Sequence, residues 1–208
     1  QSQILLGIAS VVENRDDSTG GHIKRTSDVI RILIDVIREK NILELSDNFC
    51  DDLIKAAPMH DLGKIGIDDK ILRKPGKLTD EEFSIMQSHV IKSAQLVEKI
   101  LNGVEEEHFV KVAFNVARYH HEKWNGKGYP YGIKEKQIPL AARIMAVADV
   151  FDAISQHRCY REAMPMNQCF KIIENGVGAD FDPEIVKVFL EIRSQVEEVH
   201  AKIQDKIE

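Results

Sequence analysis

Apolar residues recur with the period of an α-helix along most of this chain of 208 residues, and this period limits the fold more than any other feature. Between Gly21 and Lys40, apolar side chains fall mostly three or four positions apart and form one broad stripe. The stripe consists of Val29, Ile30, Leu33, Val36 and Ile37. No segment shows the strict alternation of apolar and polar residues that is typical of a half-buried strand. The sequence therefore predicts a compact all-α domain.

The same period and the capping residues place further helices and one long loop. Helices are expected at residues 3–14, from Ser46 to His60-Asp61, from Thr79 to Leu101, at 105–122, at 140–155 and from Asp182-Pro183 onward. Glycines and prolines predict a loop over residues 124–139. The charged segment 193–208 is expected to be a solvated helix end. We expect a single domain over residues 1–208, with a core of about residues 13–189 and a C-terminal helix to 208.

Charge and cysteine content argue against several classes of function. The formal net charge of −6 disfavours binding to bulk nucleic acid or to an anionic membrane, which requires a basic surface. The three cysteines, Cys50, Cys159 and Cys169, contain no Cys-x-x-Cys pair, which favours free thiols in a reducing compartment such as the cytoplasm. The longest apolar run, ILLGIASVV, is too short to span a bilayer, and no signal-peptide pattern is present. Because the chain begins with Gln1, we expect a piece of a longer protein.

Two pairs of neighbouring residues indicate a site that binds more than one ion or molecule. The stretch YHHEKWNGKGYP at residues 119–130 contains His120 next to His121. Adjacent residues on a helix point about 100° apart, so such a pair suits a cleft that binds two things. His60 and Asp61 form a second pair, at the end of an apolar segment. Asp149 lies on an apolar helix face, where a carboxylate is costly unless something pairs with it.

Imidazoles and carboxylates that converge in an apolar cavity suggest metal ions. A mixed set of this kind suits manganese, iron or zinc better than magnesium or calcium. Neighbouring ligands suit two ions with one bridging carboxylate, and two such ions about 3.5–4 Å apart can promote an in-line displacement at phosphorus. Lys64, one turn after His60, is placed to neutralise charge on a phosphate.

Simpler interpretations of each residue stay open. A single inward histidine is more often a hydrogen-bonded core residue than a ligand. Asp149 alone could pair with an arginine, and WNGKGYP alone could be a surface turn. Three histidines with polar neighbours are expected on the surface, and these are His108, His157 and His200.

Several motifs together resemble the HD-GYP family of the HD phosphohydrolase superfamily. They are ENRDDSTGGH (13–22), MHDLGKIGI (59–67), KPGKLT (74–79), HHEKWNGKGYP (120–130) and RIMAVADVFDAISQHRCYR (143–161), in this order. The resemblance covers Glu13 to Phe189, which is nearly the whole chain. It implies a bacterial, mostly helical, metal-dependent phosphodiesterase that acts on cyclic di-GMP. It also implies a regulatory protein with an upstream sensory or receiver domain and protein partners.

The resemblance also implies roles for individual residues. Two divalent ions, iron or manganese, would be held by His22, His60, Asp61, His89, His120, His121 and Asp149. Asp61 would bridge the ions, and Lys64 would contact the scissile phosphate. Substrate contacts would come from Tyr129, Asp152, Arg158 and Arg161. Hydrolysis would expel the 3′ oxygen and give the linear dinucleotide pGpG, which could be cut further to GMP.

Departures from the family pattern leave some alternatives open. Asn125, Cys159 and Asp68 stand where the family commonly has Asp, Pro and Pro, which puts loop shape and substrate preference in question. Ser18 stands where some relatives carry a glutamate and hold a third ion, so we expect two ions. The alternatives are a non-catalytic receptor for a cyclic dinucleotide, a phosphohydrolase for cyclic GMP-AMP or another nucleotide, and a purely structural helical domain.

Overall fold

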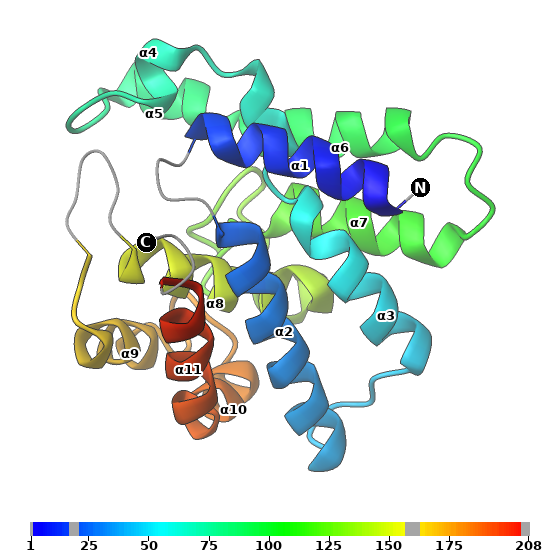
Figure 1. The fold of residues 1–208 in the computed structure, drawn as a ribbon, viewed down its shortest axis with the longest axis vertical. Coiled ribbons are helices and arrows are strands. Elements are labelled where there is room, and N and C mark those ends of the chain that lie inside the picture. Colours follow the sequence, from blue (N-terminus) through cyan, green and yellow to red (C-terminus); the bar gives the residue numbers. More distant parts are fainter. Residues whose placement is uncertain (1, 17–20, 157–162, 205–208) are drawn as a thin grey trace.

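The computed structural model describes residues 2–16, 21–156 and 163–204, and within these ranges most of the chain is helical (Figure 1). The α-helices are α1 (Ser2–Asp16), α2 (His22–Glu39), α3 (Asp47–Ala56), α4 (Asp69–Leu72), α5 (Asp80–Gln87), α6 (His89–Ile100), α7 (Glu107–Tyr119), α8 (Leu140–Ser155), α9 (Met166–Asn175), α10 (Pro183–Glu191) and α11 (Arg193–Gln204). Short 3-10 helices are η1 (Ala57–Met59), η2 (Leu62–Gly66) and η3 (Glu135–Gln137). The described part of the chain contains no strand, which confirms the predicted all-α class.

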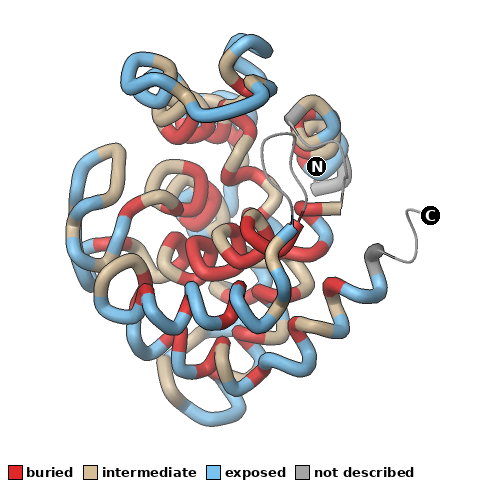
Figure 2. The backbone as a smooth tube through the Cα atoms, turned by 90° about the vertical axis from the view of Figure 1, so that its left-hand side faces the viewer, coloured by how far each residue is buried: buried red, intermediate tan, exposed pale blue. Residues whose placement is uncertain are grey.

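Helix α8 forms the centre of the core. It is apolar on all sides, and Ile144, Met145, Val147 and Phe151 have no exposed surface. Helices α2, α7, α9 and α10 pack around it, so that a largely buried stretch of backbone runs through the middle of the molecule (Figure 2). A helix that is hydrophobic all round is stable only when it is enclosed in this way. The polar residues of α8, Asp149 among them, are therefore held in fixed positions inside the protein.

The helix predicted from Ser46 to Asp61 ends earlier than expected. Ser46 caps α3 as predicted, by accepting a hydrogen bond from the Phe49 amide, but α3 ends at Ala56. Pro58 lacks an amide hydrogen, so it cannot donate the next helical bond, to the Ile54 carbonyl, and its ring crowds that carbonyl. The chain continues as η1 and η2, and His60 and Asp61 lie at the junction between them. This junction frees the two side chains from helical spacing.

The helix predicted from Thr79 to Leu101 is two helices. The capping box of Thr79 and Glu82 is present as expected, but α5 ends at Gln87 and α6 begins at His89. At Ser88 the hydroxyl donates a hydrogen bond to the Ile85 carbonyl at 2.5 Å. Such side-chain bonding to the backbone competes with the regular helical pattern. His89 is thereby the first residue of α6.

The C-terminal prediction was partly wrong. Asp182 caps α10 as expected, by accepting from the Glu184 amide, but the helix breaks at Ile192 and continues as α11. Helix α11 packs against α2, and one face of it is buried rather than solvated. Val196 has no exposed surface and His200 is 1% exposed, so the prediction of a surface His200 was wrong. The buried face of α11 is narrow, and most other residues of this segment are charged or polar, so the sequence pattern did not indicate it.

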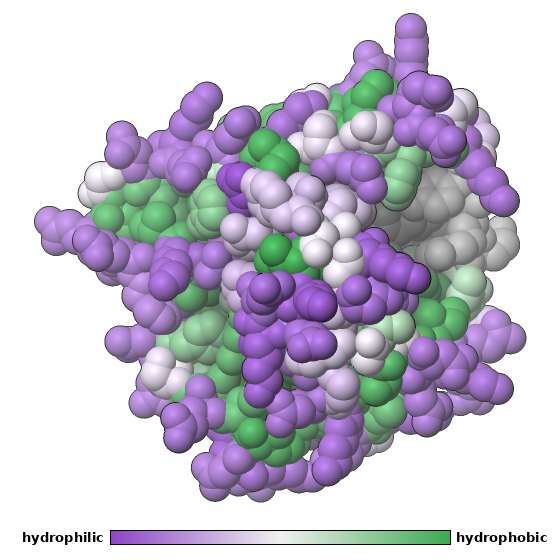
Figure 3. Space-filling view, turned by 180° about the vertical axis from the view of Figure 1, so that it is seen from behind, coloured by the Kyte–Doolittle hydropathy of each residue, from purple (hydrophilic) through white to green (hydrophobic). Residues whose placement is uncertain are grey.

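The loop over residues 124–139 is present as predicted, with η3 as its only helical turn. It is called the GYP loop below. The face of the molecule seen from behind is mostly hydrophilic, with smaller hydrophobic areas between charged side chains (Figure 3). Among the described helices, none combines the length and the apolar character that crossing a membrane requires.

Candidate metal centre

Five imidazoles and one carboxylate converge where α2, η1, η2, α6 and the end of α7 meet. Their potential ligand atoms form two groups, and within each group all atoms lie within 4.8 Å of one another. The first group is Asp61, His89, His120 and His121, and the second is His22, His60 and Asp61. Asp61 is the member that the two groups share. Six of the seven predicted metal ligands are thus brought together.

The first group explains the adjacent histidines. Helix α7 ends at Tyr119, so His120 and His121 lie at its end rather than within it. Their ring centroids are 4.1 Å apart, and both rings face the same cluster. The Asp61 Oδ1 atom lies 3.2 Å from His89 Nε2 and 3.7 Å from His120 Nε2. One carboxylate oxygen is therefore near two imidazole nitrogens.

The second group has Asp149 at its edge. The Asp149 Oδ1 atom lies 3.6 Å from His22 Nε2 and 3.7 Å from His60 Nε2. The two imidazole nitrogens are themselves 3.1 Å apart. Asp149 comes from the buried helix α8, and 7% of the surface of this residue is exposed. The seventh predicted ligand thus lies beside the other six.

The outer nitrogens of the rings fix which nitrogen faces inward. The Nδ1 atoms of His60, His89 and His120 lie 2.8, 2.7 and 2.9 Å from the carbonyl oxygens of Ala57, Met86 and Val116, respectively. A carbonyl only accepts, so each Nδ1 carries a hydrogen and each Nε2 is the nitrogen that points into the cluster. Metal-bound histidines are usually oriented in this way by their second nitrogen.

The buried atoms of the cluster fit a cation. His89 Nε2, His120 Nε2 and Asp61 Oδ1 are buried and have no hydrogen-bond partner among the described residues. Two imidazole lone pairs 3.1 Å apart, at His22 and His60, would repel each other unless a proton or a metal ion lay between them. Unpaired buried acceptors are costly, and divalent ions would satisfy all of them at once. The donor set of imidazoles and carboxylates suits iron, manganese or zinc.

The electrostatics of the cluster favour a charged carboxylate. Burial alone would raise the pKa of Asp61, but Lys64 and His60 hold that pKa well below its ordinary value. Burial opposes a charged His60, yet the carboxylates of Asp61 and Asp149 raise its pKa to about 9. Burial, together with His120 and His89, lowers the pKa of His121 well below its ordinary value. The cluster therefore attracts positive charge at one end and holds a neutral ligand at the other.

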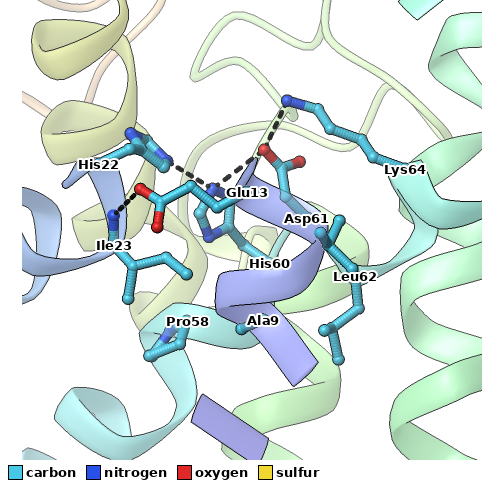
Figure 4. Close-up of a pocket in the computed structure, with 10 residues that line it drawn as sticks. Ala9, Glu13, His22, Ile23, Pro58, His60, Asp61, Leu62 and Lys64 are labelled. Atoms are coloured by element: carbon cyan, nitrogen blue, oxygen red, sulfur yellow. Dashed lines mark hydrogen bonds and ion pairs between the residues drawn. The ribbon is translucent and has the colours of Figure 1, made fainter. Parts of the chain in front are cut away.

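Lys64 lies at the rim of the cluster. Its ammonium nitrogen is 2.7 Å from Asp61 Oδ2, and its side chain is 13% exposed. Figure 4 shows Lys64, Asp61, His60 and His22 along one pocket. Glu13 of α1 lines the same pocket and accepts a hydrogen bond from the Ile23 amide at 2.9 Å. Glu13 begins the motif ENRDDSTGGH, but nothing in the sequence pattern indicated a role for it.

Asp152 does not lie where the predicted substrate role would place it. Its carboxylate is 1% exposed and lies behind the cluster, with Oδ2 2.8 Å from His22 Nδ1. The guanidinium of Arg25 donates to both oxygens, at 2.5 and 3.1 Å. Arg25 was missed, although it stands one turn before Val29 on the apolar face of α2, an unusual place for a charge. Asp152 is thus in a position to orient His22.

Tyr129 places the GYP loop against the cluster. Its ring centroid lies 4.9 Å from that of His121 and 6.5 Å from that of His89. Glu122 holds the loop, because its buried carboxylate accepts from the Tyr131 amide at 2.7 Å. Five of the residues singled out from the sequence lie outside the described residues, and these are Ser18, His157, Arg158, Cys159 and Arg161. His108 is exposed as predicted, and it pairs with Asp52 at 2.6 Å.

The chain is similar to known proteins over most of its length. The family model described as HD domain matches residues 15–185. A Vibrio cholerae protein named "Probable cyclic di-GMP phosphodiesterase" is 42% identical over 91% of this chain and 44% of its own length. A second protein of that organism, named "3'3'-cGAMP-specific phosphodiesterase 2", is 32% identical over 98% of this chain and 37% of its own length. This chain thus spans half or less of the length of these curated relatives.

A solved structure has the same fold. The crystal structure of a cyclic GMP-AMP specific phosphodiesterase from Vibrio cholerae matches 97% of this chain and 50% of its own length. The TM-score is 0.67 at 17% sequence identity. At that identity the likeness concerns the arrangement of the helices.

Proposed function

This chain belongs to the HD domain family and is of the HD-GYP type, and from this premise we propose that it is a metal-dependent phosphodiesterase that hydrolyses a cyclic dinucleotide. Cyclic di-GMP is the first candidate substrate, because relatives that match nearly the whole chain carry that activity in their names. The observation that carries the proposal is the position of Asp61. It belongs to both ligand groups and lies 2.7 Å from the Lys64 ammonium.

We propose two divalent ions, iron or manganese, as the cofactor. The seven ligands are His22, His60, Asp61, His89, His120, His121 and Asp149. Asp61 would help to hold both ions, because it is the residue common to both groups. When bound, two such ions stabilise the attacking and the leaving oxygens of an in-line displacement at phosphorus.

The surrounding residues have separate roles in this proposal. Lys64 is a catalytic residue that contacts the scissile phosphate and stabilises the negative charge that develops in the transition state. Tyr129 lines the substrate groove beside His121. Asp152 orients His22 instead of contacting substrate, because its carboxylate is buried and occupied by His22 and Arg25. Arg158 and Arg161 remain proposed contacts for phosphate or guanine.

The test is turnover by protein loaded with a defined metal. The chain is purified anaerobically and loaded with iron or manganese, and products from cyclic di-GMP are separated by chromatography. We expect pGpG, with GMP as a later product. Asp61→Ala is expected to lose turnover, because two ions repel each other without a shared anion. Binding of cyclic di-GMP without hydrolysis would support the receptor alternative instead.

Cyclic GMP-AMP is the second candidate substrate. The observation that favours it is the relative named as specific for 3′3′-cGAMP, which matches 98% of this chain. The ratio of kcat/KM values for the two dinucleotides, measured side by side, decides between them.

We also propose a cytoplasmic location, which the odd number of cysteines supports, and an upstream sensory or receiver domain.

A further inference from the structure

A large aromatic residue is exposed beside the metal centre. Phe83 belongs to α5, and 49% of its surface is accessible. Its ring centroid lies 6.4 Å from that of Tyr129, and the two rings are nearly perpendicular, with an interplanar angle of 80°. The pair joins α5 to the GYP loop, two segments that are far apart in the sequence. Phe83 has no role in the proposed mechanism.

Phe83 stands at the outer end of a row of rings that leads to the cluster. Its neighbour Tyr129 lies 4.9 Å from His121 and 6.5 Å from His89, both of which are proposed ligands. A phosphate held at the cluster would therefore have Tyr129 beside it and Phe83 one ring further out. In a nucleotide one ribose separates the base from the phosphate. Phe83, one ring away from the ring beside the phosphate, is therefore placed where a base could lie.

Helix α5 holds Phe83 in a fixed position. The Phe83 amide donates to the Thr79 carbonyl at 2.8 Å, in the first turn of the helix. Thr79 and Glu82 form the capping box, and Lys74 bonds the Glu82 carboxylate at 2.6 Å. Because the backbone is fixed in this way, little conformational freedom would be lost when a ligand contacts the ring.

We propose that Phe83 stacks on one base of the cyclic dinucleotide and thereby adds affinity for the substrate. This inference rests on the proposed function. Aromatic side chains bind bases through their faces, and this contact tolerates any base because every base has a π-face. Phe83 has no hydrogen-bonding group that could distinguish guanine from adenine. It therefore strengthens binding of cyclic di-GMP and cyclic GMP-AMP alike.

The experiment compares four variants of the metal-loaded protein. Phe83→Ala and Phe83→Leu remove the ring, and Phe83→Trp keeps an aromatic face. Ile85→Ala is the matched control, because Ile85 lies on the same helix and is 45% exposed. Steady-state kinetics are measured on both dinucleotides and on bis(p-nitrophenyl) phosphate, which has no nucleobase.

Loss of the ring should raise KM and leave kcat unchanged. We expect KM for both dinucleotides to rise about five- to tenfold in the Ala and Leu variants, the lower range for base stacking. Phe83→Trp should restore KM, and Ile85→Ala should match the wild type. Metal content and activity on bis(p-nitrophenyl) phosphate should not change in any variant.

Several results would overturn the proposal. Equal KM values for Phe83→Ala and the wild type would exclude stacking, and a normal KM for Phe83→Leu would show that apolar cover alone suffices. Lost metal in Phe83→Ala would indicate a structural role. A wild type that hydrolyses neither dinucleotide would contradict both the proposed function and the stacking. If the wild type is active, the proposed function holds, and the Phe83 variants then test the stacking alone.

Discussion

Lys64 lies beside the Asp61 carboxylate and at the rim of the pocket. In the proposed function it both keeps Asp61 ionised and contacts the scissile phosphate. Replacement by Met keeps most of the side-chain volume but removes the charge. We expect Lys64→Met to lower kcat by about 10²–10³, the usual loss when one charge-stabilising donor is removed from a transition state. The measurement is kcat at saturating cyclic dinucleotide, together with metal content.

Metal content serves as the control for Lys64. The ammonium is not a ligand in the proposed centre, so the metal content of Lys64→Met should equal that of the wild type. An unchanged kcat would remove Lys64 from the mechanism. A variant that lost its metal would show that Lys64 acts mainly by keeping Asp61 ionised.

Asp152 offers a test between orienting a ligand and contacting substrate. Asp152→Asn keeps the shape of the side chain but weakens the charged bonds to His22 and Arg25. Partners of metal ligands typically contribute 10–100-fold to metal affinity. We therefore expect metal affinity to fall by about that factor, while KM for the dinucleotide at saturating metal stays the same. A raised KM with normal metal affinity would restore the substrate role.

The sequence indicated which side chains cluster better than it indicated the residues that support them. His60-Asp61 and His120-His121 stand out as neighbouring pairs, whereas His22 was included because of the resemblance to the HD-GYP family. The roles of Asp152 and Arg25 depend on a contact between residues 127 positions apart in the chain, which no local pattern encodes. Glu13 was missed for the same reason, because only the packing of α1 brings it to the pocket.

At the scale of elements, periodicity predicted where helices lie but not where they break. The predicted helices ending at Asp61 and Leu101 are each divided, at Pro58 and at Ser88. Both breaks depend on geometry as well as propensity, since helix α6 and η2 approach each other closely. The divisions place His60, Asp61 and His89 at the ends of elements, where side chains can converge. The breaks are therefore part of what builds the site.

The close approach of η2 and α6 rests on Gly63. A Cβ atom at Gly63 would lie 2.1 Å from the His89 carbonyl oxygen and 2.4 Å from the Ser93 amide nitrogen, and both are backbone atoms. Gly63→Ala must therefore push η2 away from α6 and separate Asp61 from His89. We expect a loss of stability of about 1–3 kcal/mol and a loss of metal, measured by urea unfolding and metal analysis.

Gly7 provides the matched control for this substitution. It lies on α1, and a Cβ atom there would meet nothing within 4 Å. Gly7→Ala should stabilise the protein slightly, by about 0.5–1 kcal/mol, because alanine is the better helix former. A Gly63→Ala protein that matched Gly7→Ala in stability and metal content would contradict the close packing of the two elements.

Helix α11 should make stability depend on pH through His200. Burial lowers the pKa of His200 to about 4, although Asp152 opposes this effect. The folded state therefore binds the proton more weakly than the unfolded state, whose histidine titrates near 6.5. Stability is fully present above pH 6.5 and is lost as the pH falls towards 4, by about 3 kcal/mol at most.

The variant His200→Gln isolates this contribution. Gln cannot be protonated, so the difference in unfolding free energy between pH 7 and pH 4.5 should be smaller in the variant than in the wild type. Both proteins are measured by urea unfolding with a chelator present, so that loss of metal in acid does not differ between them. Parallel pH curves for the two proteins would show that His200 takes up its proton without cost.

At the scale of the whole molecule, the proposed metal centre gathers residues from segments that lie far apart in the sequence. The proposed ligands come from α2, the junction of η1 and η2, α6, the end of α7 and α8. The all-α class followed from the sequence because most of the chain shows the helical period and no segment shows the alternation of a strand. The way the helices assemble around α8 did not follow from periodicity, since contacts between distant segments decide it.

Because the ligands span the molecule, bound metal should stabilise the whole fold. An ion that binds only the folded state at 100 times its Kd adds about 2.7 kcal/mol. For a chain of this size each kcal/mol raises Tm by about 2–4 °C, so each occupied site should raise Tm by about 5–10 °C. We expect manganese to raise Tm, EDTA to reverse the effect, and Asp61→Ala to respond far less.

Metal analysis of the saturated wild type should give two ions per chain. A Tm that did not respond to manganese would show that the cluster does not bind this metal, and three ions per chain would contradict the expected count of two.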